Sequence, residues 1–197
     1  MDGTWGHGGA YQTWTRFLRD WGAHGGAATA EAAARLPVLR PEDFHCETWA
    51  RFSGEFTEAL DRRLRDWAAA LTAALDAAGD EFAAGRALAQ ARTGLDAVRA
   101  LTAHPALPPD LRARLRELTE GHIAGFQRQL EAALDGALRS GADPRAVEAR
   151  RRTLRDNPLT APGPGGAPAP DRAPGRAPGD GWAYDPAAPA RRRIVTD

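Results

Sequence analysis

Residues 45–101 read HCETWARFSGEFTEALDRRLRDWAAALTAALDAAGDEFAAGRALAQARTGLDAVRAL, without a proline. Large apolar residues or alanines recur in this stretch at steps of mostly three and four, the spacing of one stripe along an α-helix. The stripe consists of His45, Trp49, Phe52, Phe56, Leu60, Leu64, Trp67, Leu71, Ala74, Ala78, Phe82, Leu88, Ala91, Leu95, Val98 and Leu101. Such a stripe is typical of a helix seam packed against another helix, as in a coiled coil. It predicts how the chain folds and indicates no reaction.

The composition also favours helices. Alanine accounts for 43 of the 197 residues, whereas valine occurs four times and isoleucine twice. Alanine is the best helix former, while strands are enriched in β-branched residues. We therefore expect an all-α fold without a sheet of any size.

Charge and cysteine content exclude several classes of function. The 26 basic residues are all arginine and balance 26 acidic residues, so the chain has no net field to attract nucleic acid. Arginine without lysine, together with abundant alanine, glycine and proline, is typical of a high-GC bacterium. Cys46 is the single cysteine, which excludes an intrachain disulfide and a multi-cysteine metal site.

The N-terminus and the hydropathy pattern predict a cytoplasmic protein. Residues 1–10 lack the basic start and the apolar run of a signal peptide. No run of about 18 apolar residues suggests a transmembrane segment.

Prolines and glycines divide the chain into helices. We expect short helices over 11–21 and 27–36, a long helix from about 41 to 104, a second from about 110 to 140 and a third over 144–156. The long helix carries four glycines, Gly54, Gly79, Gly85 and Gly94, each costing about 1 kcal/mol relative to alanine, so one break or kink is expected. The stripe of the second helix is Leu111, Leu115, Leu118, His122, Phe126, Leu130, Leu134 and Leu138.

The turn at Pro105, Pro108 and Pro109 is short, so the two striped helices are expected to form a long antiparallel hairpin. At its open end we expect the short N-terminal helices and the third helix to cover Trp49, Phe52, Phe56 and Trp67. Apolar surface left uncovered there would form an interface, most simply that of a homodimer.

The C-terminal part differs in composition. Residues 158–190 hold nine prolines and six glycines and cannot bury enough apolar surface to offset the cost of ordering them. We therefore expect a helical domain over 1–156, a disordered linker over 157–181 and a candidate linear motif over 182–197.

The candidate partner-binding residues of that motif are Trp182, Tyr184, Arg191, Arg192, Arg193, Ile194 and Val195. The β-branched run could add as a strand to a partner's sheet while an aromatic side chain fills a pocket. Two alternatives remain, namely an unselected frayed terminus and a segment that folds back on its own helices.

Other reactive side chains indicate no catalytic, metal or cofactor site. Glu42 and His45 have the Glu-x-x-His spacing of di-iron bundles, but the chain contains no second copy of that pattern. Cys46 lies beside His45, yet consecutive helical residues point about 100° apart. His122, on the stripe of the second helix, is expected to be a structural seam residue.

The sequence therefore predicts a non-enzymatic interaction or adaptor protein. One alternative is an anion-binding module that uses Arg150, Arg151 and Arg152 together with the second arginine triplet, 191–193, on nucleic acid or lipid. Another is an enzyme or small-ligand site in the aromatic N-terminal bundle around Trp49.

Overall fold

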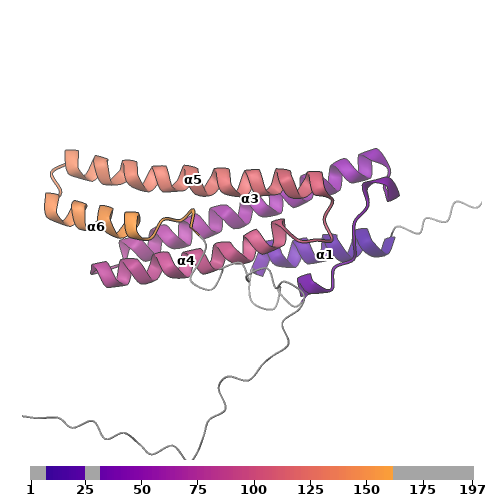
Figure 1. Cartoon of the computed structure of the whole chain (residues 1–197), viewed down its shortest axis with the longest axis horizontal. Helices are drawn as coiled ribbons and strands as arrows, with labels where there is room; N and C mark the ends of the chain where they lie inside the picture. The colour runs from indigo at the N-terminus through magenta and orange to yellow at the C-terminus, as the bar shows by residue number, and fades with distance from the viewer. Residues whose placement is uncertain (1–7, 25–31, 162–197) are drawn as a thin grey trace, which may run out of the picture. The chain divides into compact units, whose positions relative to one another are not determined.

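The computed structural model describes residues 8–24 and 32–161, and every regular element in these ranges is helical (Figure 1). The elements are α1 (Gly8–His24), a 3-10 turn η1 (Pro41–Asp43), α3 (Cys46–Asp76), α4 (Glu81–Thr102), α5 (Pro109–Arg139) and α6 (Pro144–Asp156). The all-α class is confirmed. Residues 32–34 are helical, and the first part of the helix expected over 27–36 lies outside the described residues.

The expected long helix is in fact two helices, because the chain breaks at residues 77–80. Gly79 weakens the helix there, and Asp80 adopts an extended backbone and caps α4, accepting a hydrogen bond from the Ala83 N–H at 2.6 Å. An N-cap side chain satisfies one of the amide groups that a helix start leaves unpaired. Of the four glycines in the expected long helix, the break therefore lies at Gly79, the one that directly precedes an N-cap residue.

The break changes the architecture from two long rods to a bundle. α3 packs against α4 and α5, and α6 returns along α4 and α5. The single antiparallel hairpin expected across Pro105–Pro109 is therefore only one of three consecutive reversals (Figure 1). Short connections of this kind place successive helices antiparallel to each other.

α3 also begins later than expected. Pro41, Glu42 and Asp43 form the 3-10 turn, and Phe44 and His45 are extended before the first residue of α3, Cys46. Glu42 and His45 therefore do not share one α-helix.

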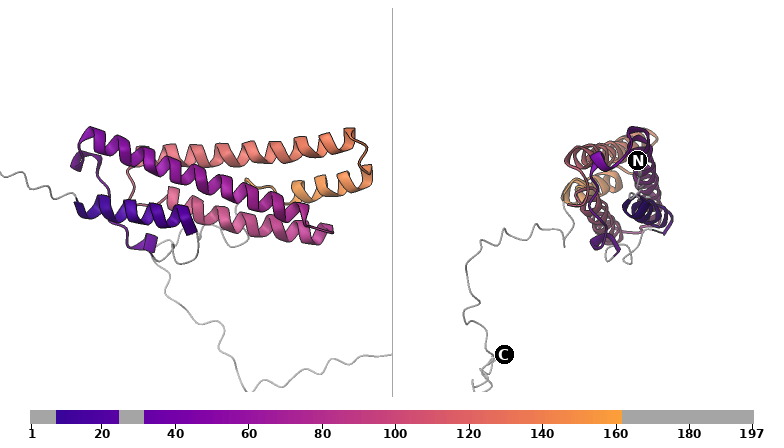
Figure 2. Two further views of the ribbon diagram at one scale, coloured as in Figure 1. Left: turned by 180° about the vertical axis from the view of Figure 1, so that it is seen from behind. Right: turned by 90° about the vertical axis from the view of Figure 1, so that its right-hand side faces the viewer.

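The aromatic end is covered by α1, which lies along the N-terminal half of α3, whereas α4 lies along its C-terminal half (Figure 2). Trp14 of α1 is fully buried, and its ring lies 6.3 Å from that of Phe52 and 6.0 Å from that of Phe56. The expectation that α6 shares this role is wrong, because α6 packs on α4 and α5. Trp67 instead contacts Phe126 of α5, with 5.3 Å between ring centroids.

The buried face of α5 differs from the expected stripe toward its C-terminus. Leu111, Leu115, Thr119 and Ile123 are the buried residues of this helix. Thr119 is tolerated there because its hydroxyl donates to the Leu115 carbonyl at 2.8 Å. At the far end Leu138 is exposed, so the stripe alone does not identify the core.

We expect Leu115→Ala to lower the free energy of unfolding by about 2–5 kcal/mol, because it removes fully buried methyl groups and leaves a cavity. Leu138→Ala, in the same helix at a side chain 40% exposed, should change it by less than about 0.5 kcal/mol. Urea unfolding followed by circular dichroism compares the two. Equal losses would contradict the packing of α5.

His104, just after α4, joins the helical body to the segment that follows α1. Its ring lies 6.0 Å from that of Trp14, and its Nδ1 accepts a hydrogen bond from the Ala106 N–H at 3.2 Å. Partial burial lowers the pKa of His104, and a hydrogen bond with the Ala33 backbone acts in the opposite direction. The neutral ring therefore fits the folded state better than the charged ring.

This lowered pKa makes folding depend on pH. Because the unfolded chain protonates His104 more readily, stability should fall as the pH drops below about 6.5, the ordinary value for histidine. His104→Asn keeps an acceptor near the position of Nδ1 and cannot be protonated, so its melting temperature should fall less between about pH 7.5 and pH 5.5. Parallel thermal melts of the two proteins measure the difference. Identical pH profiles for the two proteins would contradict the assignment of this pH dependence to His104.

Candidate functional site

The most elaborate polar site in the described chain holds the residues that follow α6. Leu159 is fully buried, although it belongs to the segment expected to be a disordered linker from residue 157. Its backbone N–H donates to Oε1 of Gln127 in α5 at 3.2 Å. Asn157 is held as well, since its Oδ1 accepts from Arg92 of α4 at 3.2 Å. Residues 157–161 therefore pack against the helical body.

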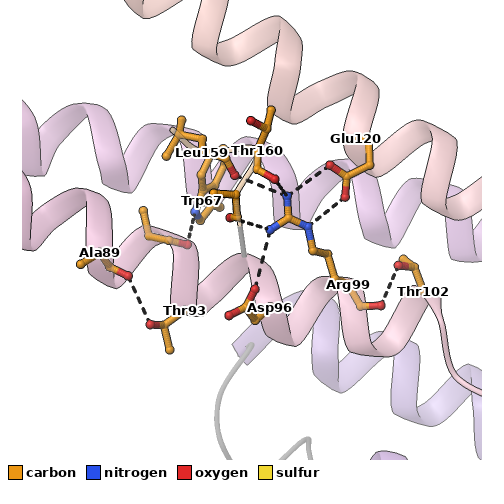
Figure 3. A network of polar contacts seen from close by, with 11 residues as sticks. Trp67, Ala89, Thr93, Asp96, Arg99, Thr102, Glu120, Leu159 and Thr160 are labelled. Carbon is orange, nitrogen blue, oxygen red and sulfur yellow. Dashed lines mark hydrogen bonds and ion pairs between the residues drawn. The ribbon is translucent and has the colours of Figure 1, made fainter. Parts of the chain in front are cut away.

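Arg99 of α4 is the centre of this site (Figure 3). Its Nε and Nη2 donate to the two carboxylate oxygens of Glu120 in α5 at 2.8 and 3.2 Å. The same guanidinium donates to the carbonyl oxygens of Leu159, Thr160 and Ala161 at 3.3–3.4 Å. The planar guanidinium group of Arg99 thus connects α4, α5 and residues 159–161.

The electrostatics of the Arg99 site favour the charged guanidinium. The hydrogen bond with Glu120 raises the pKa of Arg99, partial burial opposes this, and the charges of Glu120 and Asp96 add to it. A bidentate arginine–carboxylate pair is stronger and more directional than a pair of neutral groups. We call Arg92, Arg99, Glu120 and Gln127, with the residues 157–161 that they hold, the tail clamp.

Sequence reasoning missed the tail clamp for an identifiable reason. Leu159 is the single large aliphatic residue in a proline-rich stretch, and nothing local showed that the bundle buries it. Arg92 and Arg99 are seven residues apart on one helix and so share a face. This seven-residue spacing was the one feature of the sequence that could have indicated the tail clamp.

The partner-binding residues expected from the sequence lie outside the described residues. These are Trp182, Tyr184, Arg191, Arg192, Arg193, Ile194 and Val195. The clamp therefore describes how residues 157–161 are held and indicates nothing about the motif itself.

The His45–Cys46 pair lies at the start of α3, with His45 as its N-cap residue. His45 and Cys46 are both exposed, and the cysteine sulfur lies 3.9 Å from Nδ1 of His45. Among the described residues, no group of three or more histidine, cysteine or acidic side chains is placed to hold a metal ion.

His122 has a different role from the one expected. It is exposed on α5, and its Nε2 lies 3.2 Å from Oδ1 of Asp61 in α3. The sequence predicted a structural residue on the seam of the second helix. The actual partner comes from another helix, and the contact ties α3 to α5.

The arginine triplet of α6 is divided among different surroundings. Arg151 pairs with Asp135 of α5 and lies 3.4 Å from Glu148. Arg150 borders an apolar hollow of about 410 Å³ between the ends of α3 and α4 and the helices α5 and α6. Arg152 is exposed. The three side chains therefore do not form one basic face.

A second hollow, of about 470 Å³, lies between α3 and α4, and we call it the α3–α4 hollow. Its lining is mostly apolar and comprises Trp67, Ala70, Leu71, Ala74, Ala83, Arg86, Ala87, Gln90 and Ala91. Next to it in sequence is Phe82, whose side chain is 81% exposed. An aromatic residue so exposed beside an apolar hollow is a candidate contact for another molecule.

Comparison with protein-family models, curated proteins and solved structures finds no match for this chain. No helix among the described ranges combines the length and the apolar character needed to cross a membrane.

Replacing Arg99 tests the tail clamp. We expect Arg99→Ala to lower the free energy of unfolding by about 1–3 kcal/mol, because Glu120 and three carbonyl groups lose a charged donor. Arg65→Ala removes an arginine from an exposed ion pair with Asp61 within α3 and should cost less than about 0.5 kcal/mol. Urea titration measures both changes. In hydrogen exchange, the amide of Leu159 should lose protection in Arg99→Ala alone; unchanged protection would count against the clamp.

Proposed function

We propose that this protein is a non-enzymatic adaptor, with a helical bundle as its body and the segment 182–197 as a tethered partner-binding motif. The observation that supports this most is the tail clamp. Two arginines, a glutamate and a glutamine of the bundle hold residues 157–161, among which Leu159 is buried. This arrangement anchors to the bundle the residues that come before the proposed tether.

The length of chain between the tail clamp and the proposed motif suits a tether. From Ala161 to Trp182 there are 20 intervening residues, and a coil of that length has a root-mean-square extent of about 25 Å. Proline extends such a chain further. A partner bound by the motif would therefore stay near the bundle.

The motif contains the residue types that short recognition segments use. Trp182 and Tyr184 supply aromatic anchors, and the run Ile194-Val195 suits addition to the edge of a partner's sheet. The triplet 191–193 would favour a partner with acidic groups beside that edge.

The interactions of the bundle's charged side chains are consistent with a structural body. Arg99 joins α4 to α5, His122 contacts Asp61 of α3, and Arg151 joins α6 to α5. These contacts hold helices together. They also argue against the anion-binding alternative, since the α6 triplet does not present its three guanidinium groups together.

Self-association of the body is the second part of the proposal. The exposed Phe82 and the apolar hollow between α3 and α4 support it. Two copies would present two motifs and so raise the avidity for a multivalent partner.

The motif is tested in the full-length protein by Trp182→Ala together with Tyr184→Ala. We expect this variant to retain the unfolding transition of the parent and to lose at least one binding partner in quantitative affinity purification from native cells. Asp171→Ala with Arg172→Ala, in the preceding linker, is the matched control and should keep that partner. The same set of captured proteins with all three baits would refute the recruiting role.

A further inference from the structure

The hollow of about 410 Å³ that Arg150 borders lies where α3 is followed by α4 and α5 is followed by α6. Figure 1 shows that these two connections, residues 77–80 and 140–143, lie at the same end of the bundle. All four helices contribute to the apolar lining, which includes Leu75, Ala84, Leu88, Leu134, Ala137 and Leu154. We call this space the bundle-end hollow. It shares no lining residue with the α3–α4 hollow or with the tail clamp.

The spacing of the lining residues shows that each long helix turns one face toward the bundle-end hollow. On α4, Glu81, Ala84 and Leu88 follow one another at steps of three and four, which keeps them on one side of the helix. The lining residues of α5, at 130, 133, 134 and 137, and of α6, at 146, 149, 150 and 153, have the same spacing. Leu88 and Leu154 are buried. The hollow therefore lies on the core side of these helices.

Short side chains explain why this end of the core is unfilled. Alanines from α4, α5 and α6 line the hollow, and helix axes in a bundle lie about 8–10 Å apart, so facing alanines leave space between them. Ligand pockets have volumes of about 300–1,000 Å³, and an apolar cavity of about 150 Å³ is enough to bind benzene. The bundle-end hollow can therefore receive an apolar group larger than benzene, as ligand sites between the helices of a bundle do.

The charge at the bundle-end hollow comes from side chains. The C-termini of α3 and α5 lie beside the N-termini of α4 and α6, so the helix dipoles at this end oppose one another. The charged residues of the lining are Asp76, Asp80, Glu81 and Arg150. Three carboxylates against one guanidinium make the lining acidic.

Two of these carboxylates are available to a ligand. Asp80 is used in part, because its Oδ1 caps α4 by accepting the Ala83 N–H. Asp76 and Glu81 are exposed, and within the described ranges neither carboxylate has a hydrogen-bond or ion-pair partner. Both border the hollow beside the reversal at residues 77–80. An apolar space with acidic groups at its exposed edge complements a molecule that is apolar at one end and cationic at the other.

We propose that the bundle-end hollow binds a small organic cation with an apolar body, of the class of hydrophobic amines and quaternary ammonium compounds. The apolar body lies between Leu88, Leu134 and Leu154, and the cationic group stays at the edge beside Asp76 and Glu81. This site goes beyond the proposed adaptor function, because it lies in the helical body and does not involve the segment 182–197.

Isothermal titration calorimetry of the purified full-length protein with decyltrimethylammonium, below its micelle-forming concentration, tests the site. We expect one saturable site per chain with a Kd between about 10 µM and 1 mM. Decyl sulfate has the same alkyl chain and the opposite charge, and should bind at least about tenfold more weakly. Octyltrimethylammonium, which is two methylene groups shorter, should also bind about tenfold more weakly, because each buried methylene group is worth about fourfold.

Two substitutions of alanine in α5 test the location of the apolar body. Ala137→Phe places a ring in the hollow and should weaken binding of decyltrimethylammonium at least about tenfold, because the ring occupies the space that the alkyl chain needs. Ala132→Phe is the matched control, since Ala132 is exposed on the same helix and does not line the hollow. Circular dichroism checks that both variants are folded.

Neutral variants at the edge of the hollow test the charge without altering the core. Glu81→Gln should weaken binding of decyltrimethylammonium about twofold to fivefold, and Arg150→Gln should strengthen it by a similar factor. Glu117→Gln, at an exposed acid of α5 outside the hollow, is the control and should leave the Kd unchanged.

Several outcomes would overturn the inference. These are the absence of saturable binding, equal affinity for decyl sulfate, undiminished binding to a folded Ala137→Phe variant, and a Kd that Glu81→Gln and Arg150→Gln leave unchanged or shift in the opposite directions. Because the edge residues are exposed, their variants decide the question even if Ala137→Phe does not fold.

Discussion

The reversal at residues 77–80 is the constraint on which the rest of the bundle depends. Because α4 turns back along α3, Trp67 can donate its indole N–H to the Ala91 carbonyl at 3.0 Å, a contact between residues 24 apart. The same reversal creates the hollow between α3 and α4. An unbroken helix would place Trp67 and Ala91 about 36 Å apart along its axis and permit none of these contacts.

The two ends of the bundle are held by different interactions. At the end formed by α1 and the start of α3, large rings fill the core, and Trp14, Phe52 and Phe56 are fully buried. Toward α6 the side chains are mostly alanine and leucine. There, polar contacts between helices, such as those of Arg99 and Arg151, fix how the helices are oriented. Hydrophobic burial is non-directional, whereas a hydrogen-bonded arginine–carboxylate pair specifies geometry. The tail clamp belongs to this second, polar part, and so the proposed tether begins where the bundle is most specifically oriented.

Local signals predicted the elements better than their packing. Pro109 and Pro144 each lie in the first turn of a helix, and the limits of α5 and α6 follow the expectation closely because proline and the Asp143 cap act on their own neighbours. Asp80 after Gly79 is an equally local signal for a new helix start. The apolar stripe continues in phase across these residues, however, and therefore favoured one long helix. For the candidate site, the spacing of Arg92 and Arg99 showed a shared face, while their partners lie up to 65 residues away along the chain.

The sequence by itself determined the all-α class, the limits of α5 and α6, and the concentration of aromatic residues toward the N-terminal end. Each of these depends on propensity, capping or composition, which act over a few residues. Tertiary structure alone decided that α1 rather than α6 covers Phe52 and Phe56, that His122 contacts Asp61, and that Leu159 is buried in the tail clamp. Those outcomes depend on which faces meet after the chain reverses, and a periodic stripe shows that a face is apolar without specifying the helix that covers it.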